Sequence, residues 1–235
     1  MTEWHTLESQ EAIRQMDSNL ENGLTAAEAE RRLAEHGPNE LVERVGISPW
    51  TILLEQFKGI MVVMLIVSAI VSVILGETTD AIVIMIIVVL NAVLGFVQEY
   101  RAEQAMAALK RMAVPHVRVR RDGRLQEITA LSLVPGDIIQ LETGNTVPAD
   151  ARLLESVNLR VQEAVLTGES EAVEKDIAPL KGENLALGDR VNSVYMGTVV
   201  TYGHGMALVT GTGMKTQLGK IADLLQSVGT EKTPL

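Results

Sequence analysis

One pentapeptide, Leu166-Thr167-Gly168-Glu169-Ser170, combines residue types that could do chemistry. Gly168 has no Cβ, so the backbone beside it can approach a ligand closely. The Glu169 carboxylate, when exposed, is ionised near neutral pH, and it can orient a water molecule and draw a proton from it. The same residues are also typical of an ordinary surface turn, so by themselves they leave both interpretations open.

No other residues form a comparable pattern. The four histidines, His5, His36, His116 and His204, are not at metal-ligand spacing, and the chain has no cysteine. A thiolate metal site, a disulfide and a cysteine nucleophile are therefore excluded. The glycine-rich stretch 211–216 lacks the spacing of a phosphate-binding P-loop. A net charge of −10 argues against a nucleic-acid partner, because phosphate binding needs a basic surface.

Two uncharged runs of 18 residues, 59–76 and 81–98, are each long enough for a transmembrane helix. Only residues 77–80 separate them, so we expect a helical hairpin embedded in a lipid bilayer. Buried elements of a soluble core are the alternative, but such helices are seldom apolar on every face over this length. Asn91 is the one strongly polar side chain in these runs, and we expect it to bond a neighbouring helix.

The basic residues predict how the hairpin is oriented. Arg44 and Lys58 precede it, Arg101, Lys110 and Arg111 follow it, and the loop 76–80 contains no Lys or Arg. Because basic residues stay on the cytoplasmic side of a membrane, both chain ends are expected in the cytoplasm. The protein is then an integral protein of the cell membrane, with its loop on the opposite side.

The chain divides into four expected segments. Residues 1–49 are predicted to form a helical docking segment without chemistry of its own. Residues 50–112 form the hairpin and a stalk, since helix-forming residues extend one helix over 81–112, roughly 48 Å long. Residues 113–227 are β-rich, and 228–235 are a linker. The predicted fold class is a multi-domain membrane protein, with a transmembrane α-helical hairpin and a β-rich cytoplasmic domain with flanking helices.

Local signals place several elements within these segments. The capping-box pair Thr25 and Glu28 predicts the start of a helix that ends at Gly37. The dipeptide Asp122-Gly123 predicts the two-residue turn of a β-hairpin. The strands expected after it are 138–141, 151–154, 194–200 and 201–213, and a helix is expected at 217–227.

A series of motifs, in order, makes the chain resemble the P-type cation-transporting ATPases. They are Gly37-Pro38-Asn39-Glu40-Leu41, the membrane helix and stalk at 91–110, Val134-Pro135-Gly136-Asp137, Val147-Pro148-Ala149-Asp150, the loop at 165–170, the stretch from Gly197-Thr198 through Gly213, and Gly219-Lys220-Ile221-Ala222. The resemblance covers nearly the whole chain and makes the β-rich domain similar to the actuator domain of that family. The calcium-type branch is the most similar, and the sodium/potassium-type pumps come next.

The resemblance implies a mechanism in which ATP, with Mg²⁺ at the phosphate, phosphorylates an aspartate of the pump. The actuator domain then brings its loop onto the aspartyl phosphate. By this resemblance Glu169 positions the water that hydrolyses the phosphoenzyme. Thr167 and Gly168 shape the approach to the phosphoryl group, and Ser170 is structural. The transported cation implied by the calcium-type branch is Ca²⁺.

The family's phosphorylation motif, Asp-Lys-Thr-Gly, does not occur in this sequence. We therefore expect an N-terminal portion of a pump, which binds neither ATP nor Mg²⁺ alone and works with phosphorylation and nucleotide-binding domains of the same pump. Residues 228–235 would lead toward a third membrane helix. The alternative is a non-enzymatic two-helix membrane protein that binds or regulates another transporter. An unrelated membrane-anchored hydrolase using Glu169 ranks last, because no nucleophile or metal cluster supports it.

Overall fold

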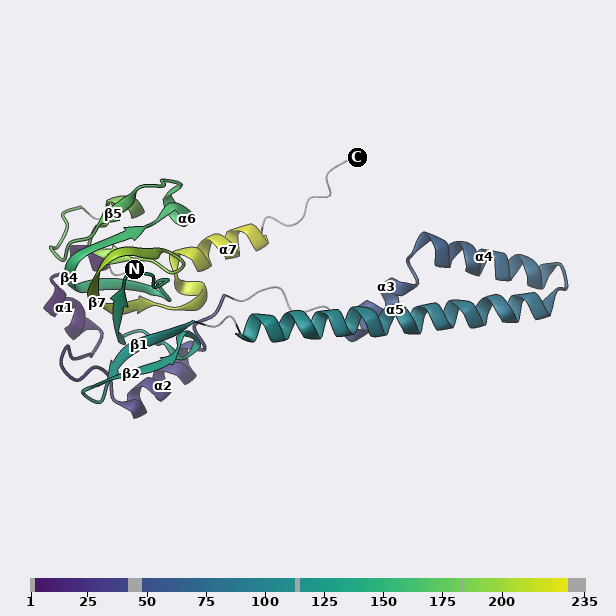
Figure 1. Cartoon of the computed structure of the whole chain (residues 1–235), viewed down its shortest axis with the longest axis horizontal. Helices are drawn as coiled ribbons and strands as arrows, with labels where there is room; N and C mark the ends of the chain where they lie inside the picture. The colour runs from purple at the N-terminus through teal and green to yellow at the C-terminus, as the bar shows by residue number, and fades with distance from the viewer. Residues whose placement is uncertain (1–2, 42–47, 113–114, 183, 228–235) are drawn as a thin grey trace. The chain divides into compact units, whose positions relative to one another are not determined.

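The computed structural model describes residues 3–41, 48–112, 115–182 and 184–227, with only the backbone given at 107–112 and 227. The chain forms two compact units. The first combines Met1–Val42 with Val114–Leu235, and the second is Glu43–Ala113. Figure 1 labels the helices and strands of both units.

An antiparallel sheet forms the centre of the first unit. Its strand order is β2-β1-β3-β7-β4-β5, and β6 pairs with β4. The described strands are β1 His116–Arg121, β2 Arg124–Thr129, β3 Ile138–Glu142, β4 Asp150–Gln162, β5 Ala172–Glu174, β6 Ser193–Val194 and β7 Val199–Gly211. The predicted hairpin turn at Asp122-Gly123 is confirmed, and both residues have positive φ.

The predicted strands 194–200 and 201–213 have the wrong boundary, because β7 runs unbroken from Val199 to Gly211 beside the equally long β4. Its glycines do not interrupt it. At Gly203, with φ of +77°, a Cβ would collide with the backbone carbonyls of Val157 and Asn158. Glycine is therefore needed there for close approach of β4, where the strand pairing is irregular.

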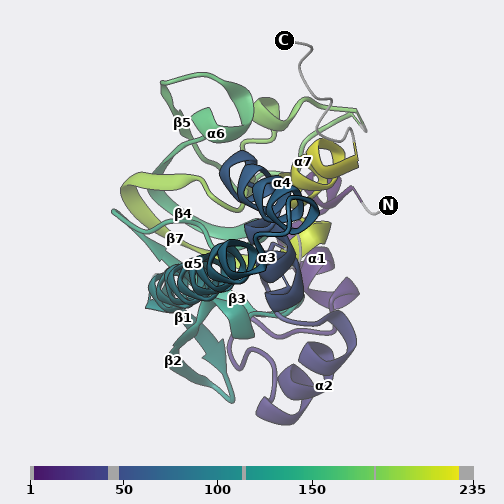
Figure 2. The same cartoon turned by 90° about the vertical axis from the view of Figure 1, so that its right-hand side faces the viewer.

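The two faces of the sheet bury different residues, as the alternation of side chains along a strand requires. Ile138 and Leu208 pack with Ala12 of α1 (Ser9–Gln15) on one face. Their neighbours Ile139 and Ala207 belong to the larger core on the other face. In Figure 2, α1 and α2 lie along the same side of the sheet.

The helix α2 (Ala26–His36) begins and ends where the sequence predicts. The Thr25 hydroxyl accepts a hydrogen bond from the Glu28 N–H at 3.2 Å, and Gly37 closes the helix with φ of 76°. The return half of the predicted capping box is not formed among the described residues. The Glu28 carboxylate instead accepts hydrogen bonds from Arg31 and Arg32.

Short helices complete the first unit. The 3₁₀ turns are η1 Trp4–Thr6, η2 Ala130–Ser132, η3 Leu187–Asp189 and η4 Gly213–Lys215, and the remaining α-helices are α6 Ala164–Thr167 and α7 Gln217–Ser227. The predicted helix at 217–227 is confirmed by α7. The predicted linker 228–235 lies outside the described residues.

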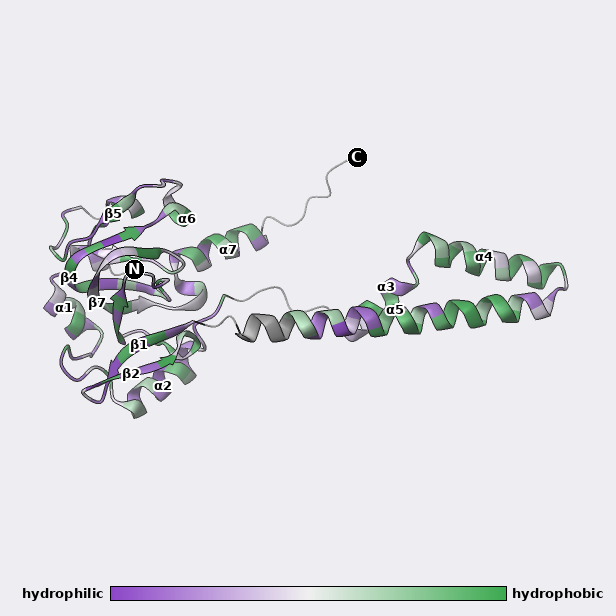
Figure 3. Ribbon diagram, in the orientation of Figure 1, coloured by the Kyte–Doolittle hydropathy of each residue, from purple (hydrophilic) through white to green (hydrophobic). Residues whose placement is uncertain are grey.

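The second unit consists of α3 (Pro49–Gln56), α4 (Ile60–Ile74) and α5 (Thr78–Met112). The single helix predicted over 81–112 is confirmed, since α5 is continuous for 35 residues. Its part Thr78–Met106 is long and apolar enough to cross a membrane. Figure 3 shows apolar residues along α4 and the first part of α5.

The first predicted membrane helix differs from the expectation. The helix α4 has 15 residues and reaches spanning length only when counted with α3, from which it is bent by 59°. The break falls where Gly59 caps the start of α4. The described residues therefore contain one candidate membrane helix by length and composition, or two if the bent pair forms a single span.

Contacts within the second unit fix how its helices pack. The helix α4 packs beside α5, and Ile52 of α3 is buried. A Cβ at Gly95 would collide with the side-chain amide of Gln56, so glycine permits close packing of α3 on α5. Asn91 is exposed in this unit and makes none of the expected hydrogen bonds with the described residues. Arg44 and the side chains of Lys110 and Arg111 lie outside the described part of the chain.

Candidate functional site

The candidate loop lies between two paired strands of the first unit. The chain leaves β4 at Gln162, forms the single turn α6, and returns along β5, where Ala172 pairs with Gln162. Both ends of the loop are thus tied to the sheet. Side chains alternate between the two faces of β4, so that Leu159 and Val161 point into the core. Glu163, two residues after Val161, is buried as well, and the loop begins there.

Local hydrogen bonds shape the loop. The Glu163 carbonyl accepts from the N–H of Leu166 at 2.9 Å and of Thr167 at 3.0 Å, and from the Thr167 hydroxyl at 3.1 Å. Gly168 ends the turn in the left-handed conformation, with φ of 78°. The Glu169 N–H then donates to the Thr167 hydroxyl at 3.2 Å. Thr167 therefore bonds to both sides of the glycine.

The tip of the loop is open to solvent. Gly168, Glu169 and Ser170 are exposed, whereas Thr167 is half-buried. A Cβ at Gly168 would meet no atom within 4 Å, so the space in front of the backbone is free for an approaching group. Among the described residues the Glu169 carboxylate has no ion-pair or hydrogen-bond partner. It can therefore act as a hydrogen-bond acceptor toward something outside this chain.

A buried ion pair that the sequence analysis missed lies at the base of the loop. Glu163 Oε1 and Lys175 Nζ are 2.6 Å apart, and their side chains are 1% and 0% exposed. Burial raises the pKa of the Glu163 carboxyl and lowers the pKa of the Lys175 ammonium, while the opposite charge of each partner counteracts the shift. The sequence did contain a signal for the burial of Glu163, because Leu159, Val161 and Glu163 occupy every second position and therefore face the same side of β4.

A second missed carboxylate, Asp150, anchors the start of α7. Its Oδ1 accepts from the N–H of Met196 at 3.0 Å, and its Oδ2 accepts from the N–H of Gln217 at 2.7 Å. Burial raises the pKa of Asp150 to about 6, against the opposing effect of these two hydrogen bonds. The resemblance had marked this residue only as the end of a turn motif.

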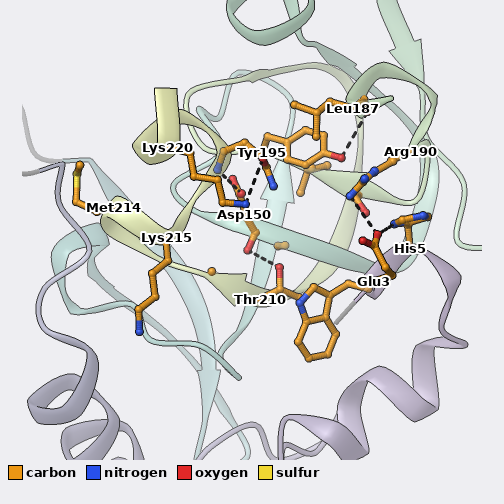
Figure 4. A pocket seen from close by; sticks show the side chains of 16 residues that line it. Glu3, His5, Asp150, Leu187, Arg190, Tyr195, Thr210, Met214, Lys215 and Lys220 are labelled. Atoms are coloured by element: carbon orange, nitrogen blue, oxygen red, sulfur yellow. Dashed lines mark hydrogen bonds and ion pairs between the residues drawn. The ribbon is translucent and has the colours of Figure 1, made fainter. Parts of the chain in front are cut away.

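Asp150 also lines a cavity of about 640 Å³ between η1 and the sheet. Figure 4 shows Glu3, His5 and Arg190 gathered at one side of it. The Glu3 carboxylate lies 3.2 Å from His5 and 3.7 Å from Arg190. These interactions are internal to the unit, and they hold the N-terminal segment against the sheet.

Two buried polar side chains connect distant parts of the first unit. The Asn39 amide donates to the carbonyls of Ala130 and Pro148 and accepts from the N–H of Gly213. The motifs Gly37–Leu41 and Val147–Asp150 therefore meet in space. Arg152, which is 0% exposed, donates to five backbone carbonyls. Those carbonyls belong to Trp4, Leu7, Leu153, Ile177 and Asn192.

No metal-ligand cluster occurs in the described residues. Among them, no group of three or more His, Cys, Asp or Glu side chains is arranged to hold a metal ion. The exposed loop offers a carboxylate without a partner among the described residues and an open glycine.

Comparison with known families agrees with the two parts of the chain. A family model described as "P-type ATPase actuator domain" matches residues 111–226. Another, described as "Cation transporter/ATPase, N-terminus", matches residues 4–72. Together they cover the β-sheet with the candidate loop, the N-terminal segment and the helix α4.

Curated proteins match the chain over its length. A Calcium-transporting ATPase 1 of Bacillus cereus is 42% identical over 100% of this chain and 27% of its own length. A Calcium-transporting ATPase of Bacillus subtilis is 43% identical over 99% of the chain and 26% of its own length. The Sodium/potassium exporting P-type ATPase cta3 of Schizosaccharomyces pombe is 43% identical over 90% and 21%, respectively. The chain thus spans about a quarter of the length of these relatives.

The sheet, the loop between β4 and β5, and these matches together define the class. The chain belongs to the P-type cation-transporting ATPases and carries their N-terminal and actuator domains. Within that family it is similar to bacterial proteins named as calcium-transporting ATPases.

Proposed function

We propose that this chain is the N-terminal and actuator part of an ATP-driven cation pump that transports Ca²⁺. The Thr167-Gly168-Glu169-Ser170 loop carries the proposal, because its exposed tip presents an open glycine beside a carboxylate that has no partner among the described residues. The names of the bacterial relatives support calcium as the cation. The proposed partners are the phosphorylation and nucleotide-binding domains of the same pump.

The proposed role of the loop is hydrolysis of an aspartyl phosphate on the partner domain. Glu169 accepts a hydrogen bond from the attacking water, orients it toward phosphorus and takes up its proton as the O–P bond forms. The bond from phosphorus to the aspartyl oxygen breaks, which returns the aspartate and inorganic phosphate. Thr167 and Gly168 shape the approach, because Thr167 holds the loop on both sides of Gly168. Ser170 has a structural role, since its carbonyl accepts from Gln162.

ATP and Mg²⁺ belong to the complete pump in this proposal. Mg²⁺ would neutralise charge on the phosphate. The described residues of this chain include no metal-ligand cluster, so the ligands of Mg²⁺ would come from other domains of the pump. The contribution of this chain is to position water at the reacting phosphorus through Glu169, where orientation and electrostatics supply much of the rate.

We further propose that α3 with α4, and α5, form a two-helix hairpin in the cell membrane. Large apolar side chains along both α4 and α5 are exposed within their unit, which suits contact with lipid. Both flanks of the hairpin would lie in the cytoplasm, since Lys58 and Arg101 flank it and the loop 76–80 has no basic residue. The part of α5 that follows Arg101 would then be a cytoplasmic stalk.

The direct test is Glu169→Gln in the complete pump, measured as the decay of ³²P-labelled phosphoenzyme after a chase. The amide keeps the size of the side chain but cannot take up a proton, so we expect decay to slow by roughly 100-fold or more. Phosphorylation by ATP should persist, and phosphoenzyme should accumulate.

Glu171→Gln is the matched control. Glu171 is also an exposed carboxylate and lies two residues further along the chain. Its amide variant should decay at the rate of the unmodified pump. Normal phosphoenzyme decay in the Glu169→Gln pump would remove Glu169 from the assigned role.

A further inference from the structure

The Glu163–Lys175 ion pair is buried and has no additional hydrogen bonds to the described residues. Removing two charges from water carries a large cost in free energy, which a single contact seldom offsets. Replacing such a pair by uncharged side chains of similar volume is often neutral or stabilising. Stability of the fold alone is therefore a poor explanation for this pair.

Its position relative to the loop suggests another role. Glu163 is the residue whose carbonyl holds the turn before Gly168, and Lys175 follows the last residue of β5. The Lys175 N–H donates to the Leu159 carbonyl at 2.8 Å. The pair thus joins the two ends of the segment that carries Glu169.

A second ion pair in the same unit, Arg121–Asp137, has additional hydrogen bonds that the Glu163–Lys175 pair lacks. Arg121 donates to both carboxylate oxygens of Asp137, at 2.8 and 2.6 Å. Arg121 also donates to the Ser132 carbonyl, and Asp137 accepts from the Val134 N–H. Each member of this pair thus has a hydrogen bond outside the pair, and the pair lies at a turn far along the chain from the loop. Its bonding is that of a pair that stabilises the fold.

We propose that Glu163 and Lys175 are positioning residues, which hold the loop so that Glu169 meets the phosphoryl group at the correct distance and angle. The inference rests on the proposed function of the loop. The physical basis is the single short contact in a low-dielectric interior, which fixes the distance between the two ends of the loop. A displacement of about 1 Å at a reacting group can reduce the rate by roughly 100-fold.

The test is the double variant Glu163→Gln/Lys175→Met in the complete pump. Both charges are removed together, so no lone buried charge remains, and the side-chain volumes stay similar. We expect a melting temperature equal to or above that of the unmodified pump. We also expect phosphoenzyme decay to slow between about 10- and 100-fold. Decay within twofold of the unmodified rate would overturn the inference, and so would a double variant that no longer folds.

Two comparisons separate this inference from the proposed function. The control Arg121→Met/Asp137→Asn should lower the melting temperature and leave the decay rate of the folded pump unchanged. Glu169→Gln is measured in parallel. If Glu169→Gln slows decay and the Glu163/Lys175 variant does not, the positioning role alone is wrong. If neither variant slows decay, the proposed function of the loop is wrong as well.

A second measurement uses the 235-residue chain and needs no ATP. A protease that cleaves after glutamate can cut at the exposed Glu169, and at the exposed Glu127 on β2 as an internal reference. In the double variant, cleavage at Glu169 should accelerate at least fivefold relative to cleavage at Glu127. An unchanged ratio would show that the pair does not hold the loop.

Discussion

Arg152 and the Glu163–Lys175 pair are both buried charged centres of the first unit, and they differ in how they are bonded. Arg152 has no carboxylate within ion-pair distance in the described residues, but its guanidinium donates to five backbone carbonyls. Glu163 and Lys175 have each other and no further hydrogen bonds. The bonds of Arg152 reach the N-terminal segment, β4 and two loops. The Glu163–Lys175 contact joins only the ends of one loop.

This difference in bonding indicates that Arg152 stabilises the fold, whereas the Glu163–Lys175 pair positions a loop. Many hydrogen bonds from one buried charge tie separate chain segments together, and losing that charge leaves several acceptors unsatisfied. A single ion pair contributes little net free energy but fixes one distance. Residues near the N-terminal segment should therefore affect unfolding, and residues below the loop should affect the reaction.

The largest effect on unfolding is expected for Arg152→Met. Five buried or part-buried carbonyls would lose their donor, which should lower the free energy of unfolding by about 3–5 kcal/mol. For a chain of this size the melting temperature should fall by roughly 10 °C. The fluorescence of Trp4, whose carbonyl bonds Arg152, can report the transition in a Trp50→Phe background in detergent.

A melting temperature within about 2 °C of the unmodified chain would contradict this expectation, because the hydrogen bonds of Arg152 would then contribute no net free energy. Burial lowers the pKa of Arg152 to about 10, so the residue stays charged at neutral pH and the measurement needs no correction for titration.

A smaller, pH-dependent effect is expected for Asp150. Burial raises its pKa in the folded chain from the ordinary carboxyl range to about 6. A raised carboxyl pKa contributes stability that is fully present below about pH 3 and is lost as pH rises to about 7, because the unfolded chain releases its proton first. The stability advantage of the unmodified chain over Asp150→Asn should therefore shrink by up to about 3 kcal/mol across this window.

The measurement is the urea-unfolding midpoint of both chains between about pH 3 and 8. Above about pH 7 the difference between them should be constant. A difference that grows as pH rises from 4 to 6 would mean that the two N–H donors of Met196 and Gln217 outweigh burial.

The smallest effect is expected for Thr25→Ala. Thr25 also fixes the N-terminal segment, but its hydrogen bond to the Glu28 N–H is exposed. Loss of this cap should cost about 1 kcal/mol, or roughly 2–4 °C in melting temperature. Thr25→Ser keeps the hydroxyl and should melt close to the unmodified chain. If Thr25→Ala lowered the melting temperature as much as Arg152→Met, the expectation that buried hydrogen bonds contribute more to stability than exposed ones would be wrong.

Much of the local structure could be predicted because its signals are local. The cap at Thr25, the turn at Asp122-Gly123 and the long helix up to Met112 follow from residue types within a few positions of each other. Strand boundaries could not be predicted as well, because β7 is continuous only where β4 lies beside it. The bend before Ile60 was also missed, since hydropathy does not distinguish one straight helix from two.

Residue order is enough to predict the family motifs, the apolar runs and the loop with Glu169. Which charges are buried, and which groups they bond, depends on how the chain folds. Glu163 and Lys175 are separated by the loop in sequence, and Arg152 bonds residues up to 148 positions away. Such contacts depend on strand pairing across the sheet, which brings together residues that are distant in sequence. Nothing in their types or in their spacing predicts that they meet.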